Sequence, residues 1–232
     1  MTKTIYILNI GNYEPEITAI TYPFIEHYAK RIGAEICFIT ERKFPEWPVT
    51  YEKLQIYELA KARPSDWQIY VDSDVLIHPE CPDYTIYLPK GTVSFHSWDL
   101  SSTRFKVDND FLRDGRYLAP GNWMTIGSDL CLDLWRPLEM TPQEAIRNIF
   151  PTPKELRHNI TPEHLVDDYA LAKNMARFGL RFKGFMEINK EQGFPEYLQH
   201  HYTVPDKVKY LMDAIEKWGL QTPEKINVLN SD

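Results

Sequence analysis

Short apolar segments and amphipathic helical segments alternate along the first hundred residues, and this alternation restricts the possible folds more than any other feature of the sequence. Four segments have the length and composition of buried strands, and two segments between them carry apolar side chains at helical spacing. The strands are expected at residues 5–10, 35–40, 68–71 and 93–96, and the helices at residues 17–28 and 51–62. Such alternation predicts an α/β fold with a parallel sheet and crossover helices.

Length and charge set limits on organisation and partners. The 232 residues, of which 43% are hydrophobic, can form one substantial core, so we expect a single domain over residues 1–232. The net charge of −7 argues against a nucleic-acid partner, because such proteins neutralise phosphates with Lys and Arg. A small diphosphate ligand can still bind if a bound cation supplies positive charge locally.

The cysteines and the apolar segments indicate the compartment. Cys37, Cys81 and Cys131 are far apart and odd in number, which predicts neither a disulfide framework nor a zinc site. The apolar segment near the N-terminus is too short for a signal sequence or a membrane span. We therefore expect a soluble cytoplasmic protein, or one domain of a longer chain.

Two acids, Asp72 and Asp74, directly follow the apolar strand at 68–71. Alternation along a strand places both on one side, where hard oxygen ligands can hold Mg²⁺ or Mn²⁺ together with phosphate oxygens. Ligands of open α/β sheets bind outside the carboxyl ends of strands, which is where these acids fall. The alternative is a solvated turn at the end of the strand.

The D-x-D after a hydrophobic strand resembles the hallmark of GT-A glycosyltransferases, whose fold is Rossmann-like with a mostly parallel sheet and helices on both faces. Three further segments resemble glycosyltransferase family eight, which includes glycogenin and bacterial galactosyltransferases. Asn12-Tyr13 is similar to the family's nucleotide loop. Thr50-Tyr51-Glu52-Lys53-Leu54 is similar to the family's T-Y-x-R-L segment. The segment from His201 to Lys207 is similar to H-x-x-G-x-x-K, with Val204 in place of the glycine. All four segments occur in the expected order.

The resemblance implies roles for these residues. The donor would contact Asn12, Tyr13, Lys53, Lys207 and, through its ribose, Asp72. Asp72, Asp74 and His201 would be the metal ligands, with His200 as the adjacent alternative to His201. Residues 1–100 would form the nucleotide-binding half of the domain and residues 101–232 the acceptor and catalytic half.

A second acidic pair, Asp167-Asp168, opens a predicted helix that ends at Gly179. Acids in a first turn favour the helix dipole and need no further role. The pair also resembles the E-D-x-x-L helix start of inverting GT-A enzymes, in which the second acid is the general base. It can equally be aligned with the D-Q-D-x-L segment of the retaining family. Both alignments place Asp168 beside the anomeric carbon and leave the stereochemistry open.

Three other segments have weaker interpretations. Gly121-Asn122-Trp123-Met124 resembles the floor beneath the donor sugar, although ordinary turn chemistry explains it as well. Trp98 and Asp99 follow a predicted strand and are candidates for acceptor contacts. Residues 101–119 lack periodicity and are expected to form a long loop that can order over the donor.

The resemblance implies a hexosyltransferase-like enzyme that uses Mn²⁺ or Mg²⁺ to transfer a sugar from a nucleotide diphosphate donor, with a UDP-sugar as the expected donor, to a carbohydrate or other hydroxyl acceptor. Two alternatives remain open. One is a haloacid-dehalogenase-like phosphohydrolase, which also has a D-x-D after a strand, although normally after the first one. The other is a nucleotide-sugar-binding domain without catalytic activity.

Overall fold

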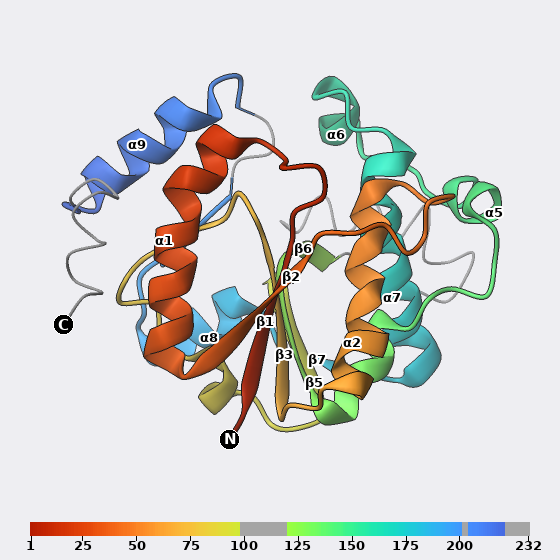
Figure 1. Ribbon diagram of the computed structural model, residues 1–232, viewed down its shortest axis with the longest axis horizontal. Coiled ribbons are helices and arrows are strands. Elements are labelled where there is room, and N and C mark those ends of the chain that lie inside the picture. Colours follow the sequence, from red (N-terminus) through yellow and green to blue (C-terminus); the bar gives the residue numbers. More distant parts are fainter. Residues whose placement is uncertain (98–119, 201–203, 221–232) are drawn as a thin grey trace.

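The computed structural model describes residues 1–97, 120–200 and 204–220 (Figure 1). Its strands are β1 (Lys3–Leu8), β2 (Ala34–Ile39), β3 (Trp67–Asp72), β4 (Leu76–Ile77), β5 (Thr92–Ser97), β6 (Pro120–Ser128), β7 (Arg181–Phe182) and β8 (Leu198–Gln199). Its α-helices are α1 (Pro15–Ile32), α2 (Ile56–Ala62), α5 (Pro142–Ile146), α6 (Pro153–Arg157), α7 (Val166–Phe178), α8 (Phe185–Gln192) and α9 (Lys207–Lys217). Its 3₁₀-helices are η1 (Val49–Gln55), η2 (Tyr84–Tyr87), η4 (Asp129–Trp135) and η5 (Pro162–Leu165).

Within the described residues, six strands form the central sheet in the order β2-β1-β3-β6-β5-β7. β1 pairs in parallel with β2 and with β3, whereas β6 runs antiparallel to both β3 and β5. β4 and β8 form a separate antiparallel pair in which Leu76 lies opposite Gln199. The sheet is therefore mostly parallel, as the sequence predicts.

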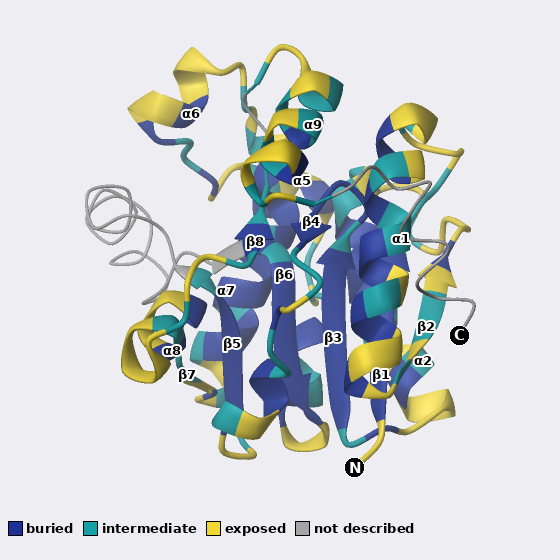
Figure 2. Cartoon of the chain, turned by 90° about the vertical axis from the view of Figure 1, so that its left-hand side faces the viewer, coloured by how far each residue is buried: buried dark blue, intermediate teal, exposed yellow. Residues whose placement is uncertain are grey.

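Helices cover both faces of the sheet (Figure 1). Along β1, Tyr6 packs with α2, η4 and α7 on one face, whereas Ile5 and Ile7 pack with α1 and α8 on the other. Strand alternation thus fills two cores from one strand. Figure 2 shows the central strands β1, β3, β5 and β6 almost entirely buried, as expected for a sheet covered on both sides.

Local signals explain where the first long helix lies. Helix α1 has Pro15 in its first turn and ends at Gly33, whose left-handed backbone (φ 66°) lets its N–H bond to Ala29 and Lys30 carbonyls. Pro23 lies inside α1, and the helix continues through it. The helix predicted at 51–62 is instead η1 followed by α2, so its first two turns are wound more tightly than expected.

Some expectations lie outside the described residues. The loop predicted at 101–119, the acceptor candidates Trp98 and Asp99, and the predicted metal ligand His201 all belong to the ranges that the structure does not describe. Strand β6 and helix α8 are additions, because the sequence patterns predicted neither of them.

Candidate functional site

Strand β3 carries the two acids of the D-x-D to the carboxyl edge of the sheet. Asp72 is the last residue of β3 and lies opposite Leu8, the last residue of β1. The turn after it is fixed at two points: the Val75 N–H donates to the Asp72 carbonyl (3.1 Å), and the Thr21 hydroxyl of α1 donates to the Ser73 carbonyl (2.5 Å). The acids therefore occupy a defined turn between β3 and β4.

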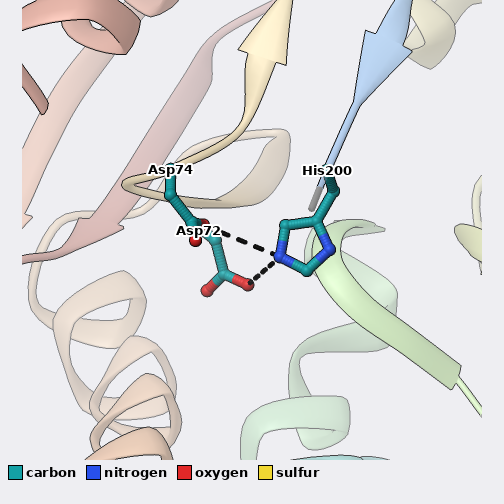
Figure 3. A group of neighbouring side chains, drawn as sticks. All are labelled: Asp72, Asp74 and His200. Atoms are coloured by element: carbon teal, nitrogen blue, oxygen red, sulfur yellow. Dashed lines mark ion pairs between the residues drawn. The ribbon is translucent and has the colours of Figure 1, made fainter. Parts of the chain in front are cut away.

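Asp72, Asp74 and His200 form a three-residue cluster (Figure 3). One ligand atom from each lies within 4.8 Å of the others. His200 Nε2 is 3.6 Å from Asp74 Oδ1 and 3.9 Å from Asp72 Oδ2. His200 directly follows β8, so the β4–β8 pairing brings it beside the acids. Of the two adjacent histidines considered as a third ligand, His200 lies in the cluster and His201 is outside the described residues.

The chemistry of this cluster suits a divalent cation. Burial lowers the pKa of His200 despite the opposing effect of Asp74 and Asp72, so the imidazole is neutral near pH 7 and can offer a nitrogen lone pair. Burial raises the pKa of Asp72, although Lys53 acts in the opposite direction. Two carboxylates and an imidazole are ligands that Mn²⁺ and Mg²⁺ accept, the imidazole favouring Mn²⁺. The donor set therefore fits such an ion.

Lys53 of η1 lies beneath the cluster with its side chain only 6% exposed. Its Nζ is 3.1 Å from Asp72 Oδ1 and 2.7 Å from Asp167 Oδ2, and it donates to the Asn122 carbonyl (3.3 Å). Burial alone lowers the pKa of Lys53, but Asp167 and Asp72 outweigh it and hold the pKa above its usual value. Lys53 is therefore a buried cation between two carboxylates.

Lys207, the first residue of α9, approaches the cluster from the other side. Its Nζ lies 2.8 Å from Glu14 Oε2, 3.5 Å from Asp74 Oδ2 and 3.5 Å from the Tyr13 hydroxyl. Burial opposes ionisation, but Glu14 and Asp74 keep the pKa of Lys207 above its usual value. Asn12 is exposed in the same loop, with left-handed backbone (φ 55°).

These groups open into a cavity of ≈ 570 Å³ at the carboxyl edge of the sheet. This volume lies in the range of small-molecule sites. Both ionic and apolar side chains line the cavity. The ionisable ones include Lys53, Asp72, Asp74, Glu155, His164, Asp167, Asp168, His200 and Lys207, and the apolar ones include Leu8, Ile10, Val49, Trp123, Ile160 and Leu165.

The two acids at the start of α7 differ in environment. Asp167 is buried, and its Oδ2 accepts both Lys53 Nζ (2.7 Å) and Asn122 Nδ2 (2.9 Å). Asp168 is half-buried and lines the cavity. The interactions of Asp167 indicate an anchoring role for that residue, and Asp168 is the more exposed of the two acids that line the cavity.

Sequence reasoning missed several residues of this site, among them Tyr70, Glu14 and His164. Tyr70 donates its hydroxyl to Asp72 Oδ1, and Tyr70 and Asp72 share one side of β3, so strand alternation could have identified it. Glu14 pairs with Lys207 across the sequence, which no local pattern signals. His164 lines the cavity and accepts the Thr161 N–H through Nδ1 (3.1 Å), which the sequence did not indicate either.

Comparisons with known proteins support the fold. No family model matches the chain, and no curated protein matches it. The chain is similar to a solved structure described as a glycosyltransferase involved in the glycosylation of the major capsid of PBCV-1. The TM-score is 0.50 at 15% sequence identity, and the match covers 92% of this chain and 99% of that one.

At this identity the similarity concerns the fold, and it confirms the predicted GT-A-like α/β architecture. The resemblance to family eight stays a prediction. In the part of the chain that the structure describes, no helix has the length and apolar character needed to cross a membrane.

Proposed function

We propose that this chain is a metal-dependent glycosyltransferase that moves a sugar from a nucleotide diphosphate donor, with a UDP-sugar as the expected donor, to a hydroxyl acceptor. The observation that carries the proposal is the cluster of Asp72, Asp74 and His200 at the edge of a ≈ 570 Å³ cavity. The similarity in fold to a solved glycosyltransferase supports it. The family-eight resemblance adds the expectation of a UDP-linked donor.

The charges along the cavity explain the need for a cation. Among the described residues that line the cavity, the carboxylates of Asp72, Asp74, Glu155, Asp167 and Asp168 outnumber the ammonium groups of Lys53 and Lys207. A diphosphate brought beside Asp72 and Asp74 would be repelled by both carboxylates. Asp72, Asp74 and His200 would hold Mn²⁺ or Mg²⁺, which when bound supplies positive charge that stabilises the departing diphosphate.

Lys207 is the residue proposed to contact the diphosphate. Its half-buried ammonium already lies between Glu14 and Asp74, at the edge of the cluster. Its contacts with Asp74 and the Tyr13 hydroxyl are long, at 3.5 Å, so a phosphate oxygen can replace them at small cost. Tyr13, whose hydroxyl lies 3.5 Å from Lys207 Nζ, and Asn12, the residue before it, are proposed to contact the nucleotide.

Asp168 is proposed to lie beside the anomeric carbon. If the reaction inverts configuration, Asp168 accepts the proton of the acceptor hydroxyl as the new glycosidic bond forms. Asp167 is less suited to this role, because Lys53 and Asn122 already occupy its Oδ2. The position of the D-x-D at the end of β3, rather than β1, disfavours the alternative of a phosphohydrolase.

Nucleotide binding tests the proposal directly. Thermal shift and calorimetric titration would compare UDP and a panel of UDP-sugars with and without Mn²⁺, using the wild type and Asp74→Ala. A ligand that binds only the native state stabilises it by about 2.7 kcal/mol at 100 times its Kd. We expect Mn²⁺-dependent stabilisation by UDP in the wild type and its loss in Asp74→Ala.

Asp213→Ala is the matched control, because Asp213 is an exposed acid on α9 that pairs with Lys209. This variant should bind UDP like the wild type. Absence of any nucleotide-dependent shift in the wild type, or full UDP binding by Asp74→Ala, would contradict the proposal. Phosphate release from simple esters in place of sugar transfer would favour the phosphohydrolase, and donor binding without turnover would favour the non-catalytic domain.

A further inference from the structure

The two carboxylate oxygens of Asp72 face different groups. Oδ1 accepts the Tyr70 hydroxyl and lies 3.1 Å from Lys53 Nζ. Oδ2 faces the imidazole of His200, with 3.9 Å between Oδ2 and Nε2. The Tyr70 hydroxyl and the Lys53 ammonium therefore hold one oxygen, and the other oxygen is directed to the position where a cation would lie.

The ammonium of Lys53 is closely surrounded by protein oxygens. An ammonium carries three N–H groups, and Lys53 has three protein oxygens within reach: Asp72 Oδ1 (3.1 Å), Asp167 Oδ2 (2.7 Å) and the Asn122 carbonyl (3.3 Å). The side chain is almost completely buried. Lys53 lines the cavity, but its ammonium already has two carboxylates and a carbonyl of the protein as neighbours.

The same contacts continue to the start of α7 and on to β6. Asn122 Nδ2 donates to the Asp167 oxygen that Lys53 also contacts (2.9 Å), and the Thr125 hydroxyl donates to Asn122 Oδ1 (2.8 Å). Lys53 thus connects the end of β3, the first turn of α7 and β6 at one buried point. Asp168, the adjacent residue on α7, is held at a fixed position relative to Asp72 by this connection.

We infer that Lys53 and Tyr70 are positioning residues, which hold Asp72 Oδ1 so that Oδ2 is presented to a divalent cation. Lys53 acts through Asp72 and Asp167 and makes no contact with the donor. The inference rests on the proposed function, because it concerns the same cation site. Outer partners that orient a metal ligand typically change metal affinity or activity by about 10- to 100-fold when they are removed.

The test measures binding of Mn²⁺ alone, without nucleotide, by the loss of the free-ion signal in electron paramagnetic resonance. The variants are Tyr70→Phe, which removes one hydroxyl from a buried ring, and Lys53→Met. We expect Mn²⁺ affinity to fall about tenfold in Tyr70→Phe and up to about a hundredfold in Lys53→Met. Removal of the Lys53 charge by itself would strengthen cation binding, so a loss of affinity reports lost orientation.

Each variant has a matched control at the other end of the sheet. Tyr28→Phe removes a buried hydroxyl that donates to the Pro82 carbonyl (3.2 Å), and Lys3→Met removes a buried lysine paired with Asp83 (3.0 Å). Both controls should bind Mn²⁺ like the wild type. If Lys53→Met does not fold, Tyr70→Phe still decides the question, because it keeps the ring and changes no charge.

Two results overturn the inference and leave the proposed function standing. One is unchanged or tighter Mn²⁺ binding in both variants. The other is normal Mn²⁺ affinity combined with weakened UDP affinity in Lys53→Met, which would make Lys53 a donor-binding residue. A wild-type chain that binds no Mn²⁺ contradicts the proposed function itself, and the inference fails with it.

Discussion

The two ends of the central sheet each bury a lysine, but they differ in how the charge is balanced. At the amino end of β1, Lys3 is 8% exposed and pairs with one carboxylate, Asp83 (3.0 Å), while also donating to the Ile32 carbonyl (2.6 Å). At the carboxyl end, Lys53 is equally buried and lies between two carboxylates, Asp72 and Asp167. Asp74, whose Oδ2 lies 3.5 Å from Lys207 Nζ, and Asp168 are further acids there.

The number of carboxylates beside each lysine distinguishes a structural ion pair from a site that is proposed to bind a ligand. A buried lysine with one carboxylate is neutral as a pair, so it needs no other partner. An excess of carboxylates in a cavity is costly unless a cation completes it, and such imbalance is typical of functional sites. The amino end is therefore a structural ion pair, whereas the carboxyl end is where we propose that a cation binds.

The largest expected effect tests whether the excess acids at the carboxyl end take part in catalysis. Asp168→Asn removes the candidate base and keeps the shape of the side chain. If transfer is inverting, the rate should fall about 10²- to 10⁴-fold, because general-base catalysis contributes that much. Affinity for UDP with Mn²⁺ should stay near that of the wild type. UDP release in the presence of acceptor and calorimetric titration measure the two quantities.

Undiminished transfer by Asp168→Asn would show that the excess acid at this position serves binding or solubility and that the base lies elsewhere. Asp213→Asn on α9 is the control for removal of one negative charge, since Asp213 is exposed and far from β3 in the sequence.

A second prediction compares the stability of the two ends. Asp83→Asn leaves Lys3 buried without a partner carboxylate, and we expect it to lower the free energy of unfolding by about 3 kcal/mol, as when one partner of a buried ion pair is lost. Asp167→Asn should cost less, about 1 kcal/mol, because Lys53 keeps Asp72 as a partner carboxylate at 3.1 Å. Urea denaturation measures both variants. Equal losses would remove the distinction between the two ends.

The smallest expected effect concerns pH. Burial lowers the pKa of His96, whose ring lies 5.0 Å from that of Trp123 on β6. The unfolded chain therefore takes up this proton at higher pH than the folded chain does. The contribution of neutral His96 to the free energy of unfolding is complete above pH 6.5, the ordinary pKa of a histidine, and is lost as the pH falls below it.

We expect the Tm of the wild type to decrease between pH 7.5 and pH 5.5, and that of His96→Asn to decrease less. Differential scanning calorimetry at several pH values measures both. The same slope in both proteins would mean that His96 makes no contribution to the pH dependence.

Much of the first half of the fold follows from local pattern. The apolar segments that predicted strands correspond to β1, β2, β3 and β5, and the helical spacing predicted α1. The sequence also named Lys53, Asp72, Asp74, Asp168 and Lys207, which lie in separate parts of the chain and line one cavity. These residues share one cavity because the segments that carry them lie at the carboxyl edge of the sheet, and the roles assigned to them stay predictions.

Strand β6 could not be predicted, because Pro120, Gly121 and Gly127 give its sequence the character of a turn. The structure explains one of these residues. A Cβ on Gly127 would lie 2.9 Å from Trp135 Cη2, so only glycine permits the close packing of β6 against η4. This reason depends on a tertiary contact, and no local pattern contains it.

The choice between His200 and His201 was open for a similar reason. The position of His200 follows from β8, a strand of two residues whose register against β4 places Gln199 opposite Leu76. Two residues carry no periodicity, and a shift of one residue would exchange the two histidines.

The pairing of β4 with β8 also has a consequence for the order of folding. The D-x-D turn lies early in the chain and His200 late, so the three candidate ligands come together only after the C-terminal part of the domain docks onto β4. During synthesis, a nascent chain that has emerged only as far as β6 presents the acids without the imidazole. Cation capture by all three side chains would thus be a late event, which follows assembly of the domain rather than guiding it.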